Sequence, residues 1–339
     1  MLQKVRSPMP EEAAAPGGPA SRAAHTFGVT VKAVTQEADD IVSFELSPPR
    51  GRKLPEFSAG AHIDVHIAPG LRRQYSLCND PRERNRYMIA VLREPGGRGG
   101  SLAMHALRKG QKIRICGPRN HFPLAGREAN FHLLLAGGIG VTPMMAMIAE
   151  LEARGADYLM HYCTRSPERT AFSERLRPLI KAGKVKLHHD GGDPSRGLDI
   201  KATLAGYTPA THLYFCGPPG FMTAVKASVG AWPVHAVHCE YFTAPEDFDG
   251  GEKRAFKIRI RRTGQLIDVP ASSSIVDALR AEGFDVETDC REGYCGTCIT
   301  RYVGGEPEHH DTVLSEDERK SYVMICCARA NSDVLELDL

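Results

Sequence analysis

The chain has 339 residues, of which 42% are hydrophobic and 25% are charged, as in an ordinary soluble globular protein. Its formal net charge of +2 gives no sign of a nucleic-acid binder, and runs such as Phe131–Ala136 are far too short to cross a bilayer. The length predicts two or three domains. Ten cysteines without a secretory leader favour a reducing, cytoplasmic compartment and metal chemistry over disulfides.

The N-terminal third predicts a tail followed by a β-barrel. Residues 1–25 are rich in Ala, Pro and Gly, which predicts a disordered tail. Short alternating runs follow, broken by Pro and Gly about every ten residues, which is typical of an antiparallel barrel. We place this barrel at residues 26–126. Its strands are expected at Phe27–Val34, Ile41–Leu46, Ala61–Ile67, Gln74–Leu77, Tyr87–Leu92 and Lys112–Cys116.

Two segments of the barrel favour a planar ligand that carries a phosphate. Arg73 and Tyr75 alternate along one strand, so a guanidinium and an aromatic ring share a face. A glycine-rich loop, residues 96–101, runs into a helical stretch at 102–107 and offers bare backbone N–H groups to an anion. Taken singly, each segment has an ordinary structural explanation. The strand could carry a surface Arg and a half-buried Tyr, and the loop could be a flexible hairpin. Together they predict a phosphate site.

Residues 127–243 predict an α/β domain with a parallel sheet, because apolar runs alternate with helical stretches. The buried strand at 130–136 ends in the glycine turn 137–143, and a helix follows at Met144–Glu152. This arrangement binds pyrophosphate, although the third glycine of the usual dinucleotide fingerprint is absent. Further strands are expected at 158–163, 185–189 and 212–216, with helical regions at 168–180 and 221–229.

The last of these strands ends at Cys216, which Gly217 and Pro218 follow. Open α/β sheets bind their ligands at this carboxyl edge. Cys216 is therefore either a small buried residue or part of the ligand site.

The C-terminal part predicts a linker and a small α+β domain. The acidic, glycine-containing segment 244–254 is typical of an interdomain linker. Residues 255–339 form the domain, with a helix capped by Ser274 and a second helix opened by the capping box from Ser315 to Glu318. Its strands are expected at 256–262, 265–269, 299–303, 323–326 and 334–339.

The cysteines of this last domain indicate an iron–sulfur cluster. Cys290, Cys295 and Cys298, with a fourth thiol from Cys326 or Cys327, give the C-x4-C-x2-C…C spacing that holds [2Fe–2S]. Gly293 and Gly296 remove side chains that would hold the backbone away. Structural zinc favours paired C-x2-C knuckles instead. Since neighbouring side chains of a strand point oppositely, only one of the two adjacent cysteines can face the cluster.

The motifs resemble those of the ferredoxin–NADP reductase superfamily, and more closely its phthalate dioxygenase reductase branch, which includes the vanillate O-demethylase reductase subunits. The resemblance covers about residues 27–339. Its motifs are Arg73-x-Tyr75-Ser76, the Gly-Arg-Gly-Gly-Ser loop at 97–101, Gly117–Leu124, Gly-Gly-Ile-Gly-Val-Thr-Pro at 137–143, Cys216-Gly217-Pro218 and His238–Phe242.

The resemblance implies that the barrel binds FMN, with Tyr75 against the ring and the Ser76 hydroxyl near flavin N5. FMN is expected over FAD because the chain passes directly from the glycine-rich loop into a helix, with no added segment for an adenosine. The implied FMN residues are Arg73, Gln74, Tyr75, Ser76, Ala90, Val91, Leu92, Arg98, Gly99, Gly100, Ser101 and Phe242.

It further implies that the α/β domain binds a nicotinamide dinucleotide and that Cys216 lies beside the nicotinamide. Ser76 and Cys216 are then the expected catalytic residues. The relatives' pattern favours NADH, and Asp190 and Asp193 suit a ribose diol, whereas Arg165 leaves NADPH open. The implied residues are Gly137, Gly138, Ile139, Gly140, Thr142, Pro143, Arg165, Cys216, Gly217 and Pro218.

For the last domain the resemblance implies a β-grasp ferredoxin whose ligands are Cys290, Cys295, Cys298 and Cys326, with Cys327 a packed bystander. Arg291, Glu292 and Tyr294 would form a docking rim. The implied function is the reductase of a Rieske-type aromatic oxygenase or O-demethylase, in which electrons pass from NADH through FMN and [2Fe–2S] to that partner. The alternatives are a reductase for a diiron or P450 hydroxylase, for a quinone or for ferric iron, and a redox sensor.

Overall fold

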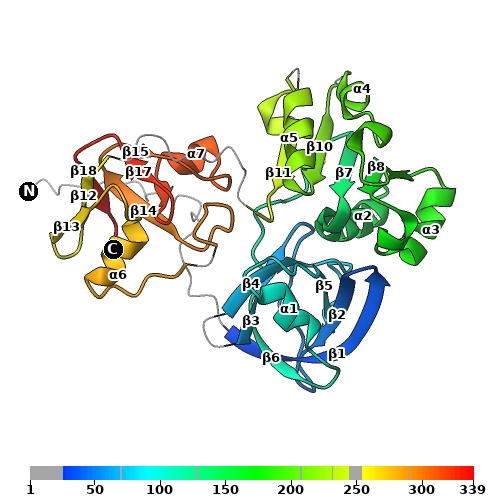
Figure 1. The fold of residues 1–339 in the computed structure, drawn as a ribbon, viewed down its shortest axis with the longest axis horizontal. Coiled ribbons are helices and arrows are strands. Elements are labelled where there is room, and N and C mark those ends of the chain that lie inside the picture. Colours follow the sequence, from blue (N-terminus) through cyan, green and yellow to red (C-terminus); the bar gives the residue numbers. More distant parts are fainter. Residues whose placement is uncertain are drawn as a thin grey trace, which may run out of the picture.

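The computed structural model describes residues 26–68, 71–126, 129–206, 208–230, 232–243, 254–288 and 290–339. These residues form an antiparallel barrel, a parallel α/β sheet and a mixed α+β sheet, which confirms the predicted fold class (Figure 1). The expected tail and, apart from Arg254, the expected linker lie outside the described residues. The helices of the described chain, α2 with its 14 residues included, lack the length and apolar content of a membrane span.

The barrel is a six-stranded sheet in the order β4-β3-β6-β1-β2-β5, with antiparallel pairing throughout. Just past β4, the Cys78 amide donates to the Met88 carbonyl of β5 at 2.8 Å, so the two edges of the sheet meet. Each expected strand is present. The elements are β1 (Thr26–Ala38), β2 (Ile41–Ser47), β3 (His62–Ala68), β4 (Leu71–Ser76), β5 (Tyr87–Leu92), α1 (Gly100–His105) and β6 (Lys112–Cys116).

The second domain is a five-stranded parallel sheet in the order β11-β10-β7-β8-β9. Its strands are β7 (Phe131–Gly137), β8 (Asp157–Thr164), β9 (Val185–His189), β10 (Thr211–Cys216) and β11 (Val237–Glu240). Its helices are α2 (Val141–Arg154), α3 (Ser173–Lys181), α4 (Ile200–Leu204) and α5 (Pro219–Ser228), with 3-10 turns at Gly138–Gly140, Pro167–Arg169, Pro194–Arg196 and Val234–Ala236.

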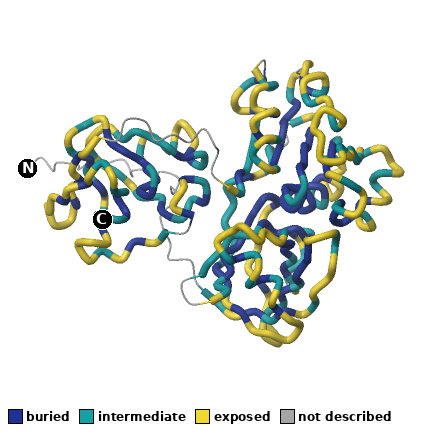
Figure 2. Tube along the Cα trace, viewed as in Figure 1, coloured by how far each residue is buried: buried dark blue, intermediate teal, exposed yellow. Residues whose placement is uncertain are grey.

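Alternate residues of this sheet face two different cores, so its strands are buried on both sides (Figure 2). Leu134 and Met160 pack with α2 and α3, whereas Leu133 and Phe215 pack with α4 and α5. The core under α2 also includes barrel residues such as Phe122. One hydrophobic core therefore spans the boundary of the barrel and the α/β domain, beside the separate core inside the barrel.

The third domain is a mixed sheet in the order β13-β12-β18-β14-β16, in which only the β12–β18 pair is parallel among the described pairs. The predicted cap is present, since the Ser274 and Asp277 side chains form a capping box on α6. The elements are β12 (Phe256–Ile260), β13 (Leu266–Val269), α6 (Ile275–Ala281), β14 (Ile299–Gly304), β15 (Pro307–Glu308), α7 (Glu316–Arg319), β16 (Tyr322–Met324), β17 (Arg329–Ala330) and β18 (Val334–Leu337).

One strand of the third domain is shorter than predicted. The expectation that strand alternation separates Cys326 from Cys327 is therefore wrong. The strand predicted at 323–326 ends at Met324, and the amides of Cys327 and Ala328 both donate to the Met324 carbonyl, at 3.1 and 3.0 Å. Cys326 and Cys327 thus lie in a turn, where the alternation of strand side chains does not apply. The choice between them depends on their contacts.

Candidate functional site

Four thiols of the third domain lie together and are buried. Cys290, Cys295, Cys298 and Cys326 are 4, 2, 3 and 6% exposed. A hydrogen bond from Cys290 lowers the pKa of the Cys295 thiol to about 7. Hydrogen bonds from Cys290 and Cys298 also lower the pKa of Cys326. The same contacts raise the pKa of the Cys290 and Cys298 thiols, so what they show is that the four sulfurs lie close together.

The grouping of these thiols fits two irons. In a [2Fe–2S] cluster, two ligands bind each iron. Hydrogen-bond contacts connect Cys290 with Cys295 and Cys298 with Cys326, and a further one joins Cys290 to Cys326.

The glycines of the cysteine loop are required by backbone conformation and by close packing. Gly293 and Gly296 have φ of 74° and 73°, the left-handed region that glycine adopts without strain. A Cβ on Gly293 would lie 2.7 Å from the Cys327 sulfur and 2.8 Å from the His310 carbonyl oxygen.

Cys327 occupies a different position from Cys326. Its thiol is half-buried beside Gly293 and donates to the Met324 carbonyl at 3.6 Å. Its hydrogen-bond contact within the thiol group is with Cys326.

The barrel brings its strongest candidate phosphate ligand over the glycine-rich loop. The Arg73 guanidinium donates to the Arg98 carbonyl at 3.1 Å, and a Cβ on Gly100 would lie 2.6 Å from the Arg73 side chain. Gly99, with φ of 79°, is the residue before α1. Arg73, the loop and the start of α1 therefore form one continuous polar surface that fits a phosphate.

Other expected flavin residues have partners within the chain. The Ser101 hydroxyl accepts from the Glu94 amide at 3.0 Å, and the Val91 carbonyl lies 3.0 Å from His105 Nε2. Tyr75 is half-buried against the barrel core. Ala90 and Leu92 also lie on β5, with Ala90 buried, and Phe242 packs against the core shared with the α/β domain.

Two expected flavin residues contact the cysteine loop across the domain boundary. Gln74 Nε2 donates to the Cys295 carbonyl at 3.2 Å, and the Arg98 guanidinium donates to the Cys290 carbonyl at 3.2 Å and lies 3.8 Å from Glu292. Two residues of the expected docking rim have partners within the chain. Arg291 pairs with Asp277 of α6, and Tyr294 packs against the core that the parallel sheet forms with α5.

Ser76 lies two positions after Gln74 on β4, and it contacts the α/β domain. Its hydroxyl donates to Glu240 Oε2 at 3.2 Å, and His62 Nδ1 lies 3.8 Å from Glu240 Oε1. Burial raises the pKa of Glu240 to about 8, so its carboxyl is protonated at neutral pH. Glu240 and His62 were not expected from the sequence. For Glu240 the available signal was an acidic residue within the motif His238–Phe242.

The glycine turn and the Cys216 segment of the α/β domain pack directly on each other. A Cβ on Gly140 would collide with the backbone of Cys216 and Gly217, and one on Gly137 would lie 2.9 Å from Pro218. Cys216 pairs with Glu240 in the sheet register and is fully buried, and burial raises the pKa of its thiol. At this carboxyl edge, where open α/β sheets bind ligands, Gly138, Ile139 and Gly217 are half-buried and Pro218 is exposed.

The remaining dinucleotide candidates divide between this edge and the surface. Gly138, with φ of 53°, and Ile139 form the turn, and the Thr142 hydroxyl donates to the Ile139 carbonyl at 3.0 Å. Pro143 lies in the first turn of α2. Arg165 is exposed after β8, beside the Asp190 turn, where Gly191 donates to its carbonyl at 2.9 Å.

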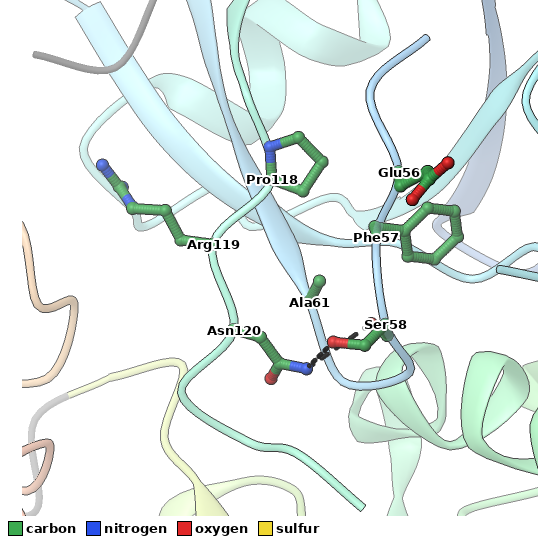
Figure 3. Close-up of a pocket in the computed structure, with 7 residues that line it drawn as sticks. All are labelled: Glu56, Phe57, Ser58, Ala61, Pro118, Arg119 and Asn120. Atoms are coloured by element: carbon green, nitrogen blue, oxygen red, sulfur yellow. Dashed lines mark hydrogen bonds between the residues drawn. The ribbon is translucent and has the colours of Figure 1, made fainter. Parts of the chain in front are cut away.

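A separate pocket of about 370 Å³ lies on the barrel (Figure 3). Arg119 and Pro118 line one side, and Phe57 and Ser58 line the other. The expected flavin and dinucleotide residues do not line it, so this pocket is not the site described above.

Three known domain families match the chain. Residues 28–123 match the oxidoreductase FAD-binding domain, residues 134–227 the oxidoreductase NAD-binding domain, and residues 258–331 the 2Fe-2S iron-sulfur cluster binding domain.

Similar proteins match nearly the whole chain. A tert-butanol monooxygenase / tert-amyl alcohol desaturase reductase subunit of Aquincola tertiaricarbonis is 45% identical over 92% of this chain and 96% of its own. Phthalate dioxygenase reductase of Burkholderia cepacia is 43% identical over 89% of this chain and 94% of its own. A vanillate O-demethylase oxidoreductase of Pseudomonas putida is 46% identical over 89% of this chain and 96% of its own.

The arrangement of all three domains also matches a solved structure. An intact type IV self-sufficient cytochrome P450 monooxygenase superimposes with a TM-score of 0.86 and 37% identity. The match covers 93% of this chain and 41% of that longer one.

Proposed function

The chain belongs to the phthalate dioxygenase reductase family, and from this premise we propose that it carries electrons from NADH through FMN and [2Fe–2S] to a separate Rieske-type oxygenase or O-demethylase. One observation carries the proposal. Along β4, Gln74 contacts the cysteine loop and Ser76 contacts Glu240 of the α/β domain, with Tyr75 between them. A single strand thus connects the three cofactor domains.

The bound groups supply the redox chemistry: a hydride enters as an electron pair, and the flavin and the cluster release the electrons singly. Arg73 and the loop at 98–101 would hold the flavin phosphate, and Tyr75 would position the ring. Ser76 would offer its hydroxyl to the flavin. The turn 137–140 and Cys216 would hold the nicotinamide half, while Cys290, Cys295, Cys298 and Cys326 would hold the cluster.

FMN is proposed over FAD because α1 follows the glycine-rich loop at once and ends at His105, seven positions before β6 starts at Lys112. The structure there offers no added segment to hold an adenosine among the described residues. We also propose a cytoplasmic location, since all ten cysteines lie in the described part of the chain as free thiols.

Anaerobic titration with NADH tests the function. The flavin absorbance should bleach, and a rhombic EPR signal of reduced [2Fe–2S] should follow, with one FMN per chain released on denaturation. Zinc in place of iron, or a protein that never binds flavin, would contradict the proposal. Release of FAD would contradict only the choice of flavin.

A second candidate partner is a P450 haem. The TM-score of 0.86 shows that the same three-domain arrangement occurs in a protein that also carries a P450. The two candidates separate when the NADH-reduced protein is mixed with a purified Rieske oxygenase or with a ferric P450. The partner reduced at the higher second-order rate is the favoured one.

A further inference from the structure

Gln74 lies on the strand of the expected flavin residues, yet its side chain contacts the third domain. On β4 it stands between Arg73 and Tyr75, and neighbouring side chains of a strand point to opposite faces. Its Nε2 donates to the Cys295 carbonyl at 3.2 Å and to Thr297 Oγ1 at 3.3 Å. The second contact reaches a side chain that the proposed function does not include.

The Thr297 hydroxyl lies between this amide and the sulfur of an expected cluster ligand. Its Oγ1 is 3.4 Å from Cys295 Sγ. A hydroxyl has one proton to donate and lone pairs that accept. The Gln74 amide uses a lone pair, and a thiolate ligand carries no proton, so a hydrogen bond to the sulfur needs the hydroxyl proton. Gln74 therefore favours the orientation in which Thr297 donates to Cys295.

Two arginines of the barrel hold the same loop by its backbone. The Arg72 guanidinium donates to the Thr288 carbonyl at 2.9 Å, and the Arg98 guanidinium donates to the Cys290 carbonyl at 3.2 Å. Gln74 is half-buried at this boundary, where partial exclusion of water strengthens a hydrogen bond. Unlike the two arginine contacts, which end on carbonyls, its contact reaches a hydroxyl that is itself close to a ligand sulfur.

We propose that Gln74 is a positioning residue that raises the reduction potential of the cluster, by directing the Thr297 hydroxyl toward the Cys295 sulfur. The inference rests on the proposed function, because it requires [2Fe–2S] on this cysteine. Hydrogen bonds to the ligand sulfurs are among the factors that set the potential of such a cluster. One added electron makes these sulfurs more negative, and a hydrogen bond to a more negative acceptor is stronger. The bond therefore favours the reduced state, and no covalent bond changes.

The contribution of Gln74 comes from outside the domain that carries the cysteines. Another hydrogen bond to a ligand sulfur arises within the loop, where the Glu292 amide donates to Cys290 Sγ at 3.3 Å. That donor belongs to the third domain and is present wherever the loop is folded. Gln74 belongs to the barrel, so its effect exists only while the two domains are in contact. The contact thus favours entry of an electron from the flavin of the same strand.

A redox titration of the full chain with its flavin and cluster tests the proposal. Dithionite and mediators reduce the protein anaerobically, and EPR of the reduced cluster gives its midpoint potential. In Gln74→Met, which keeps the length but has no N–H, reduction should be about threefold to tenfold less favourable, a shift of roughly 28–59 mV to lower potential for one electron. Thr297→Val should shift the potential in the same direction by at least as much. Thr300→Val is the matched control and should titrate as the wild type, because its hydroxyl donates to the Cys298 carbonyl at 3.3 Å.

The double variant separates this role from a general loosening of the boundary. If Gln74 acts through Thr297, Gln74→Met adds no further shift to that of Thr297→Val. Equal potentials in Gln74→Met and the wild type overturn the proposal, and so does a shift that persists in full in the double variant. The expected shifts in a protein whose flavin NADH does not reduce overturn the proposed function alone, whereas a wild type without a [2Fe–2S] signal overturns both. If Gln74→Met does not fold, Gln74→Asn, whose amide is one carbon shorter, replaces it with the same expected shift.

Discussion

Cys326 and Cys327 are adjacent in sequence, yet their thiols have different neighbours. Cys326 contacts Cys290 and Cys298, whereas Cys327 contacts Cys326 and packs beside Gly293. We therefore expect Cys326→Ser to lose the cluster and Cys327→Ser to keep it, as measured by iron content and EPR. Cys298→Ser should also lose the cluster, while NADH still bleaches the flavin. Loss of iron in Cys327→Ser but not in Cys326→Ser would reverse the ligand assignment.

Glu240 makes the stability of the chain depend on pH. In the folded chain its pKa is raised to about 8 by burial, whereas an unfolded chain loses the proton near the ordinary value of 4.5. The folded state thus binds one more proton at Glu240 between these values, so the contribution of this carboxyl to stability is fully present below pH 4.5 and falls as pH rises toward 8, by up to about 1.4 kcal/mol per pH unit.

Glu240→Gln should remove this contribution. The thermal midpoint of the variant should fall less than that of the wild type between pH 5.5 and 8. Differential scanning calorimetry of both proteins at matched ionic strength measures it. Parallel pH profiles for the two proteins would show that Glu240 is ionised in the folded chain.

At the scale of elements, the junction of the Gly138–Gly140 turn with α2 has no room for a side chain. A Cβ at Gly140 would collide with the carbonyl of Cys216 and lie 2.7 Å from the Gly217 nitrogen, and backbone of a central strand cannot easily move. Overpacking costs about 1–3 kcal/mol of folding stability. Gly140→Ala can relieve it only by a shift of the turn on β10, so NADH binding should weaken about tenfold.

Gly220→Ala in α5 is the matched control, because a Cβ there meets nothing within 4 Å. It should bind NADH as the wild type does. The dependence of the flavin reduction rate on NADH concentration gives both affinities. Equal affinities in the two variants would show that the packing of the turn on β10 does not form the dinucleotide site.

At the scale of the whole molecule, contacts between the barrel and the cysteine loop hold the two redox domains together. Arg98 lies 3.8 Å from Glu292, and both side chains are about half exposed. Glu292→Lys replaces this attraction by repulsion, so electron transfer from flavin to cluster should slow about threefold, within the range for an exposed pair. Stopped-flow optical spectra after NADH mixing measure the rate.

The effect should shrink at high ionic strength, because exposed charges are screened. Glu316→Lys on α7, in the same domain, makes the same charge change away from this contact and should leave the rate unchanged. An equal slowing in both variants would assign the effect to net charge and not to the Arg98–Glu292 contact.

Much of the fold was readable from the sequence because its signals are local. Strand alternation, glycine turns and caps such as Ser274 depend on residues a few positions apart, and they gave the three sheets and α6. The strand predicted to reach Cys326 ends earlier, at Met324. The hydrogen bonds to the Met324 carbonyl form a turn there, and the apolar residues of this segment give no local sign of that turn.

The sequence by itself determined which chemistry the chain can hold, since thiol spacing and glycine turns are set by covalent order. Only the tertiary structure decided which groups meet. His62, Ser76 and Glu240 are separated by up to 178 positions, and they meet because β3 begins where β4 and β11 end. Burial at that boundary raises the pKa of Glu240 and so keeps its carboxyl protonated. This burial comes from strands that are distant in sequence, so the residues next to Glu240 do not predict it.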